Sequence, residues 1–335
     1  MRRRRHLAHI LAFGVSCGLT AGAAQATEGG ASLYLPGLRG PLAGVTPPPG
    51  FYFNNDFYAY SGELAGGRRI QIGGAVLADV DIEARVDFLT ASWITPLELL
   101  GGHLGLGLTL PFGVPRVSSG IVIEAPRLGR TFAFSQRDAS LVLGDPVVSS
   151  FVGWNADKFH WQTGVSVSIP AGGYEEGELS NVAFNRWIGD LYGAITYLDP
   201  ELDLDISGTV GFEINGENDA TDYDSGNAVH VDLAISKNFT KEFSVGVLAG
   251  HYRQVSGDGG EGNRIGPFKG RVTAVGATAA YTFTVAGTPV STRIKVLREV
   301  DVDNRPEGTI GLLTVAFPLG GAAAPEAARP VTAKY

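Results

Sequence analysis

The sequence predicts an all-β fold, a transmembrane antiparallel β-barrel of about 12 strands with short periplasmic turns and long extracellular loops. Three observations favour this class. Apolar and polar side chains alternate along many segments, an export signal opens the chain, and the connections between predicted strands alternate in length. A barrel in an outer membrane combines these features, because its strands turn one face to lipid and the other to a lumen.

The alternation is clearest between Leu202 and Asn215, and segments 80–88 and 229–237 repeat it. Successive side chains of a strand point to opposite faces, so each segment has an apolar and a polar face. Alternation alone also fits a soluble sandwich. In a barrel, we expect the polar faces to line the lumen and set its selectivity, although they could also be solvated faces without selectivity. The predicted lumen-lining residues are Asp81, Glu83, Arg85, Asp87, Asp203, Asp205, Glu213, His230, Asp232, Arg293, Lys295 and Glu299.

The start of the chain favours the barrel over the sandwich. Arg2 to Arg5 precede an apolar stretch at 7–22, and Ala24-Gln25-Ala26 provides a cleavage site, so residues 1–26 are predicted to be a secretory signal peptide. A membrane anchor over the same residues is the less favoured alternative, because the apolar stretch is short for a span. No later stretch resembles a transmembrane helix, so any membrane crossing must use strands.

Cleavage of this signal would change the chemistry available to the chain. It removes Cys17, the only cysteine, which excludes thiol catalysis and cysteine-ligated metals in the mature protein. It also lowers the formal net charge from -8 to -12, because four arginines leave and no acidic residue does. An acidic exported chain is a poor binder of nucleic acid.

The mature chain divides into three predicted parts. Residues 27–49 are rich in glycine and proline, and we expect a periplasmic lead-in or a plug that folds into the lumen. The barrel is expected over 50–318, followed by a disordered Ala- and Pro-rich tail at 319–335. Strands are predicted over 50–60, 80–94, 102–114, 141–154, 158–170, 186–198, 201–215, 227–238, 243–254, 270–284, 289–300 and 308–318.

The connections between these strands distinguish two rims. Short connections at 95–101, 155–157, 199–200, 239–242 and 285–288 alternate with long polar stretches at 61–79, 115–140, 171–185, 216–226 and 255–269. Aromatic residues near the short connections are predicted to form a girdle at the lipid headgroups: Trp93, Trp154, Tyr197, Phe239, Phe243 and Phe283. Aromatics in the polar loops are predicted to capture solute: Phe132, Phe134, Tyr174, Phe184 and Phe268.

Several motifs resemble one protein family. They include Glu28-Gly29-Gly30-Ala31-Ser32-x-Tyr34-x-Pro36-Gly37, Pro47-Pro48-Pro49-Gly50-x-Tyr52-Phe53, Gly144-Asp145-Pro146, Gly153-Trp154, Pro170-Ala171-Gly172-Gly173-Tyr174 and Gly250-x-Tyr252-x-Gln254. These motifs resemble the MetA-pathway phenol-degradation proteins, also called SphA-like outer-membrane proteins, over nearly the whole mature chain. The resemblance implies an outer-membrane channel for hydrophobic or aromatic small molecules.

Sequence and resemblance together predict passive passage of such solutes through a narrow lumen. The expected partners are outer-membrane lipid, a small hydrophobic or aromatic solute and the barrel-assembly machinery, with no cofactor and no enzymatic activity. No Gly-x-Ser-x-Gly, His-Glu-x-x-His or phosphate-binding glycine loop is present. The acidic loop 216–226 could hold a calcium ion, but solvated turns are the favoured interpretation. Two rival classes stay open: a binding protein for a lipid-like ligand, and a structural barrel with a plugged lumen.

Overall fold

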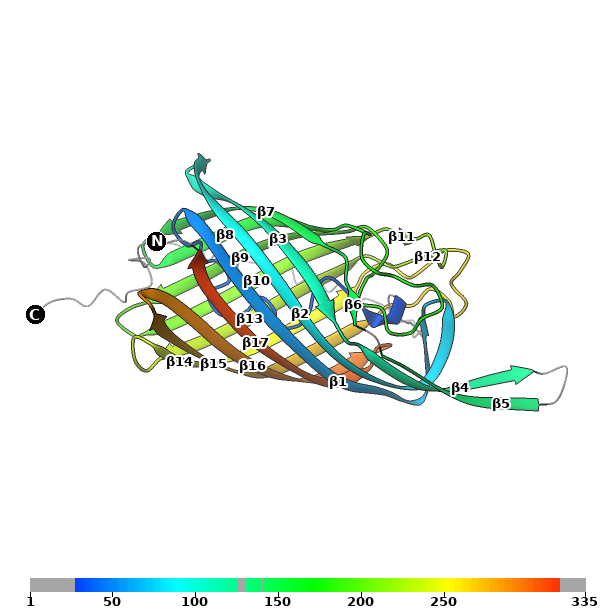
Figure 1. Ribbon diagram of the computed structural model, residues 1–335. Helices are drawn as coiled ribbons and strands as arrows, with labels where there is room; N and C mark the ends of the chain where they lie inside the picture. The colour runs from blue at the N-terminus through cyan, green and yellow to red at the C-terminus, as the bar shows by residue number, and fades with distance from the viewer. Residues whose placement is uncertain (1–27, 126–129, 140, 320–335) are drawn as a thin grey trace, which may run out of the picture.

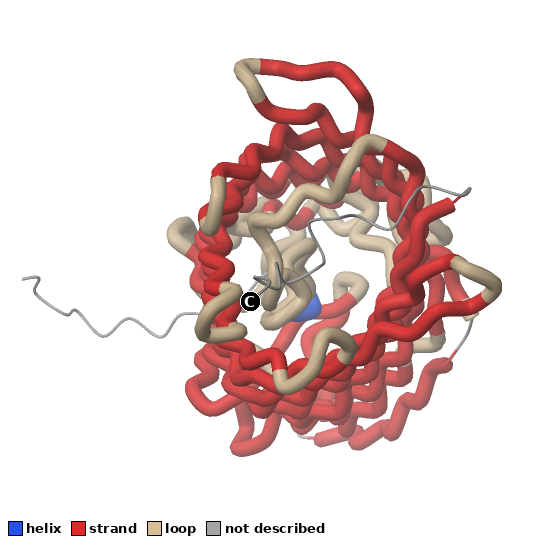
Figure 2. The backbone as a smooth tube through the Cα atoms, turned by 90° about the vertical axis from the view of Figure 1, so that its left-hand side faces the viewer, coloured by secondary structure: helices blue, strands red, loops and turns tan. Residues whose placement is uncertain are grey.

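The computed structural model describes residues 28–125, 130–139 and 141–319. The predicted signal peptide at 1–26, and the predicted tail beyond Leu319, lie outside these described residues. Twelve of the 15 strands in the main sheet close into an antiparallel barrel, seen from the side in Figure 1 and along its axis in Figure 2. The predicted fold class is confirmed.

The barrel strands vary in length from ten to 25 residues. They are β1 (Gly50–Ile72), β2 (Ala75–Leu99), β3 (Gly102–Gly113), β7 (Val147–Ala156), β8 (Phe159–Ser168), β9 (Ile188–Asp199), β10 (Leu204–Asn215), β13 (Ala228–Asn238), β14 (Phe243–Gln254), β15 (Arg271–Val285), β16 (Thr288–Asp303) and β17 (Glu307–Leu319). Each pairs with its neighbours in chain order, and pairing of β1 with β17 closes the ring. Closure of the ring gives the backbone N–H and C=O groups of every strand a hydrogen-bond partner, which lipid cannot provide.

Tight turns connect the strands at one end, called the turn rim below and seen at the left of Figure 1. Between β15 and β16, Ala286 and Gly287 both have positive φ, 50° and 85°, which matches the right-handed twist of a two-residue hairpin. The other end, the loop rim, carries the long connections at 114–146, 169–187, 216–227 and 255–270. The predicted distinction between a rim of short turns and a rim of long loops is therefore confirmed.

Two predicted loops at the loop rim contain strands. Strands β1 and β2 run through most of 61–79 and meet at a Gly73-Gly74 turn, with a register shift between Leu64 and Arg69. The region 115–140 contains the hairpin of β4 (Arg116–Ala125) and β5 (Arg130–Ala139), which extends beyond the barrel in Figure 1. Cross-strand pairing stabilises these segments, although apolar and polar residues alternate only weakly along their sequences.

Smaller elements complete the fold around the loop rim. They are the 3-10 helix η1 (Glu28–Gly30) and the short strands β6 (Val142–Leu143), β11 (Glu217–Asn218) and β12 (Tyr223–Asp224). Among the described residues, no helix has the length and hydropathy needed to cross a membrane.

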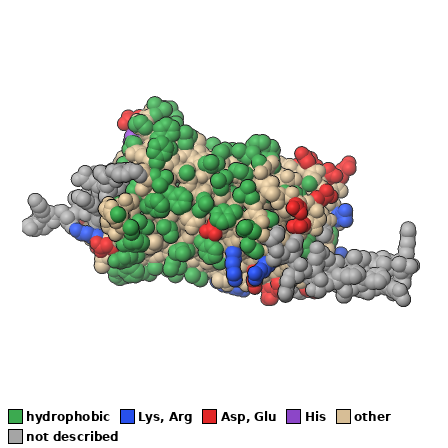
Figure 3. Space-filling view, in the orientation of Figure 1, with side chains coloured by type: hydrophobic (Ala, Val, Ile, Leu, Met, Phe, Trp, Pro, Cys, Tyr) green, Lys and Arg blue, Asp and Glu red, His purple; other side chains and the backbone are tan. Residues whose placement is uncertain are grey.

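The outer wall of the barrel is apolar over a broad band. Val210, Leu233 and Val247 on three adjacent strands each expose more than half of their surface outward. Figure 3 shows the face formed by β1, β2, β3 and β17, where hydrophobic side chains also dominate and most charged side chains lie toward the two ends. Such a band is what an outer-membrane barrel turns to lipid.

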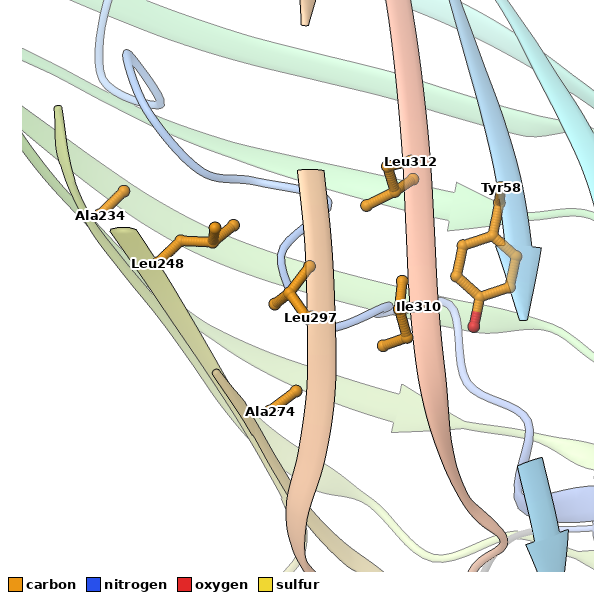
Figure 4. Close-up of a cluster of buried hydrophobic side chains, with 7 residues drawn as sticks. All are labelled: Tyr58, Ala234, Leu248, Ala274, Leu297, Ile310 and Leu312. Atoms are coloured by element: carbon orange, nitrogen blue, oxygen red, sulfur yellow. The ribbon is translucent and has the colours of Figure 1, made fainter. Parts of the chain in front are cut away.

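The inner wall carries an apolar cluster on one side. Seven buried residues form it: Tyr58, Ala234, Leu248, Ala274, Leu297, Ile310 and Leu312. Figure 4 shows these side chains on their separate strands, with the chain that precedes β1 running beside them. Leu35 and Leu38 of that preceding chain pack against the cluster. The interior therefore offers an apolar seat for a segment inside the barrel.

Candidate functional site in the barrel interior

Residues 28–49, called the N-terminal segment below, lie inside the ring of strands (Figure 2). Buried backbone groups need hydrogen-bond partners, and the described part of this segment joins no strand of the wall. Wall side chains act as partners instead. The amide of Gly37 donates to Asp232 Oδ1 at 2.8 Å, and Lys295 Nζ donates to the carbonyl of Gly37 at 2.8 Å. Two opposite charges of the wall thus hold one residue of the segment.

Nearer the turn rim, the segment lies directly against β8 and β9. The amide of Gly44 donates to Thr196 Oγ1 at 2.9 Å. A Cβ atom added to Gly44 would lie 2.5 Å from the carbonyl oxygen of His160 and 2.6 Å from the amide nitrogen of Thr196. Only glycine fits at this point, because both neighbours are backbone atoms that cannot swing away.

An aromatic stack holds the middle of the segment. The Tyr34 ring stacks with His230, at 4.1 Å between ring centres, and with Tyr252, at 6.2 Å. Its hydroxyl donates to Asp232 Oδ1 at 2.9 Å, and His230 Nε2 is 2.8 Å from Asp190 Oδ1. Stacking and charge-assisted hydrogen bonds therefore act on the same side chain.

Acidic side chains hold the start of the segment near the loop rim. Glu213 Oε2 accepts hydrogen bonds from Ser32 Oγ at 2.7 Å and from the Tyr34 amide at 3.2 Å. Glu28 Oε2 accepts from Asn218 Nδ2 at 2.9 Å and from Thr221 Oγ1 at 3.2 Å. The acidic loop 216–226 thus contacts the N-terminal segment.

Seven of the twelve predicted lumen residues point into the barrel. Most of them are nearly inaccessible to solvent, because they contact the N-terminal segment or one another. They are Asp205, Glu213, His230, Asp232, Arg293, Lys295 and Glu299. Asp203 precedes β10 in a turn with φ of 49° and lies 3.9 Å from Lys237 Nζ, so it belongs to the turn rim. A solute that crosses the lumen must therefore pass beside these contacts.

The prediction is wrong for the four lumen residues placed on β2. Ile82, Val86 and Phe88 face the interior, so the intervening residues Asp81, Glu83, Arg85 and Asp87 face outward. Alternation defines two faces but does not say which one meets the lumen. Here the inner face of β2 is apolar because apolar residues of the N-terminal segment lie opposite it.

Outward polar residues on β2 find partners on neighbouring strands. Asp87 Oδ1 accepts a hydrogen bond from Asn55 Nδ2 at 3.1 Å, and Glu83 lies 3.9 Å from Arg116. Asp87 is six residues from Trp93 on the same strand, or about 20 Å along the strand. With a tilt of about 45° this corresponds to about 14 Å across a bilayer, near the middle of the apolar band.

A cavity of about 320 Å³ lies between the N-terminal segment and the inner face of β1, β2 and β3. Most of its lining is apolar or aromatic. The lining includes Leu35 and Leu38 from the segment, and Tyr58, Ile82, Val86 and Phe88 from the wall. It also includes Thr109 and Val147, the last pair that joins β3 to β7 before β3 turns to pair with β6. The cavity therefore extends to a place where the pairing of the wall changes partner.

Arg39 is the only basic residue of the N-terminal segment and contributes to the cavity lining. Its guanidinium carbon lies 3.4 Å from the centre of the Tyr192 ring, a cation–π contact. One of its nitrogens is 4.0 Å from Asp190 Oδ2. The wall thus balances this charge with a ring and a carboxylate.

The predicted loop aromatics occupy different environments. Phe184 lines the cavity, and Tyr174 is half-buried in the same loop. Phe268 is only 4% exposed, so its proposed role as an accessible capture residue is wrong. Phe132 and Phe134 belong to β5 rather than to a loop, and their side chains lie outside the described part of the chain.

Buried hydrogen bonds order the loop that contains Phe268. Asp258 accepts from the Tyr223 hydroxyl at 2.7 Å and from the Gly226 amide at 2.7 Å. Burial raises the pKa of Asp258, which these donors only partly oppose. One carboxylate thus joins two loops of the loop rim.

The six predicted girdle aromatics face outward near the turn rim. Trp93 stacks on Phe51 at 5.6 Å between ring centres, and Phe239 lies 6.3 Å from Phe243. The other rings pair similarly: Trp154 with Trp161, Tyr197 with Phe159, and Phe283 with Tyr281. Amphipathic rings favour the headgroup level of a bilayer, which agrees with their place at the edge of the apolar band.

Sequence reasoning did not identify the residues of the N-terminal segment that contact the wall. Tyr34 stood in a family motif, and Arg39 was the only cation of a Gly- and Pro-rich stretch, so both carried a signal. Arg305, which lines the cavity from the β16–β17 connection, carried none.

The profile of the family described as "Putative MetA-pathway of phenol degradation" matches residues 65–313. No curated protein sequence matches the chain significantly. An outer membrane channel from Pseudomonas putida F1 has a TM-score of 0.65 and 18% identity, over 82% of this chain and 97% of that one. This likeness shows the fold.

Two further solved structures resemble the chain more distantly. A FadL homologue from Pseudomonas aeruginosa has a TM-score of 0.42 and 9% identity, over 80% of this chain and 90% of that one. The translocator domain of the autotransporter NalP from Neisseria meningitidis has a TM-score of 0.42 and 11% identity, over 81% and 88%. Neither likeness is close enough to carry an argument.

Proposed function

Because the chain belongs to the family of the putative MetA-pathway of phenol degradation, we propose that it is an outer-membrane channel for passive passage of small hydrophobic or aromatic compounds. The observation that carries the proposal is the mostly apolar cavity inside the barrel, between the N-terminal segment and the inner face of β1, β2 and β3. An apolar solute gains free energy by leaving water for such a cavity. The description of the Pseudomonas putida structure as an outer membrane channel agrees with this. We assign transport rather than catalysis to the chain.

Export and insertion form part of the proposal. Residues 1–26 direct the chain across the inner membrane, and the barrel-assembly machinery inserts the strands. Outer-membrane lipid then covers the apolar band, and the aromatic girdle settles at the headgroups near the turn rim. The turn rim faces the periplasm, and the loop rim faces outward.

Passage begins at the loop rim. Phe184 is the loop aromatic that lines the cavity, so it is suited to transfer a solute from the loops to the interior. The N-terminal segment fills the lumen beside the cavity and must shift before a solute reaches the turn rim. Contacts with wall side chains, rather than strand pairing, hold the N-terminal segment. The segment can therefore shift while the barrel wall stays intact.

The initial rate of uptake of a radiolabelled aromatic compound by intact cells tests the proposal. Cells that produce the protein should take up the compound several-fold faster than cells without it. Phe184→Ala should reduce the gain, whereas Trp187→Ala should not. Trp187 is the matched control, because it lies in the same connection, is 57% exposed and does not line the cavity. Equal uptake with and without the protein would refute the proposed function.

A further inference from the structure

A second arginine besides Arg39 lines the cavity. Arg305 lies in the short connection between β16 and β17 and turns inward, so that only 9% of its surface is exposed. It lines the cavity at the end near the loop rim, beside Glu299 and Pro306. Its guanidinium carbon lies 4.7 Å from the centre of the Tyr252 ring. The ring supports a positive charge but does not neutralise it.

One nitrogen of the Arg305 guanidinium lacks a hydrogen-bond partner. This atom, Nη1, is buried. None of the ion pairs among the described residues includes Arg305. Glu299 is the neighbouring acid of the lining, but its Oε2 atom accepts hydrogen bonds from the Tyr60 hydroxyl at 3.0 Å and the Gly308 amide at 2.6 Å.

Other buried or cavity-lining cations of the same interior are paired. Arg186 donates to Asn215 Oδ1 at 3.1 Å and to the carbonyl of Ala31 at 3.2 Å. Lys295 donates to two carbonyls, and Arg39 lies beside Asp190. A buried charge without a partner is costly, whereas a bound anion would restore its hydrogen bonds. The Nη1 atom of Arg305 is thus a buried donor in the cavity that is free to bind a ligand.

The cavity around Arg305 fits a ring. Tyr58 and Phe88 contribute aromatic faces, and Ile82 and Val86 contribute aliphatic ones. A volume of about 320 Å³ is at the lower end for small-molecule sites. One aromatic ring with one small polar substituent matches both the size and the chemistry.

We propose that the cavity holds an anion site at Arg305 and that its preferred solutes are small aromatic carboxylates. The inference rests on the proposed function, because it names the solute class of the same cavity. The guanidinium donates to the carboxylate oxygens, and its planar fork suits a two-oxygen group. The ring of the solute packs against the apolar wall of β1 and β2.

Calorimetric titration of the purified mature protein with benzoate and with benzamide at neutral pH tests the proposal. Benzamide has nearly the same shape as benzoate and no charge. The wild type should bind benzoate at least about tenfold more tightly than benzamide, since a hydrogen bond to a charged group has this size of effect. Arg305→Gln should remove the preference and leave benzamide binding unchanged. Arg298→Gln should behave as the wild type.

Arg298 is a matched control because it lies on β16, faces outward and pairs with Glu307 at 2.8 Å. Arg305→Lys keeps the charge and should retain part of the preference, which covers the case in which Arg305→Gln fails to fold. Equal affinity of the wild type for benzoate and benzamide, or an unchanged preference in Arg305→Gln, would overturn the anion site. Persisting uptake of neutral aromatics in either case would leave the proposed function intact, so the two failures are distinguishable.

Discussion

Replacement of Gly44 by alanine should release one end of the N-terminal segment from the barrel wall. The added Cβ would lie 2.5 Å and 2.6 Å from backbone atoms of β8 and β9, where ordinary contact begins at 3.4 Å. Overpacking of this kind costs about 1–3 kcal/mol. Loss of the hydrogen bond from Gly44 to Thr196 adds about 0.5–1.5 kcal/mol. The sum, about 1.5–4.5 kcal/mol, raises the undocked population by roughly 10- to 2,000-fold.

Single-channel recording in planar bilayers measures this change. Gly44→Ala should open far more often than the wild type, at unchanged thermal stability of the barrel. Gly40→Ala is the control in the same segment, because the nearest heavy atom to its added Cβ would be 3.6 Å away. If Gly44→Ala opens no more often than Gly40→Ala, the docked segment does not limit conduction, and the reasoning fails.

Three further substitutions test the faces of the barrel. Asp87→Leu removes an outward carboxylate from the apolar band and should raise the free energy of unfolding in lipid by up to about 2 kcal/mol; a decrease would show that Asp87 faces no lipid. Val210→Arg, at an outward position that is 59% exposed, should lower the same quantity by about 2–4 kcal/mol, and an unchanged value would contradict a lipid-facing wall. Asp232→Ala removes the acceptor of Tyr34 and Gly37 and should weaken docking of the segment by about 1.5–3 kcal/mol per bond. Faster proteolysis of the segment in detergent measures this loss, and unchanged protease resistance would argue against docking of the segment through Asp232.

Most of the barrel was predictable because period-two alternation and turn residues are local signals. The alternation of apolar and polar residues along β10 indicates which residues share a face. The pair Ala286-Gly287 lies at the tight turn between β15 and β16. The long hairpin of β1 and β2 was not predictable beyond residue 60, because its glycine-rich part is ordered by the strand opposite rather than by its own pattern. Pairing across strands is not visible in a local window of sequence.

The interior was less predictable because it depends on what the barrel encloses. The pattern of β2 was recognised, but its faces were assigned the wrong way round, since the apolar N-terminal segment makes an apolar inner wall favourable there. Arg305 follows a strand and precedes a proline, a context that suggests an exposed turn. Only the fold shows that its side chain turns into the cavity.

The conductance of the mature protein with and without residues 28–49 is the decisive test of a channel that its own N-terminal segment obstructs. The barrel strands begin at Gly50, so the deletion removes the contents of the lumen and no part of the wall. We expect small or rare current steps for the mature protein and larger, long-lived steps for the deletion variant. An intact, correctly inserted deletion variant that conducts no better than the mature protein would contradict a channel obstructed by its own N-terminal segment.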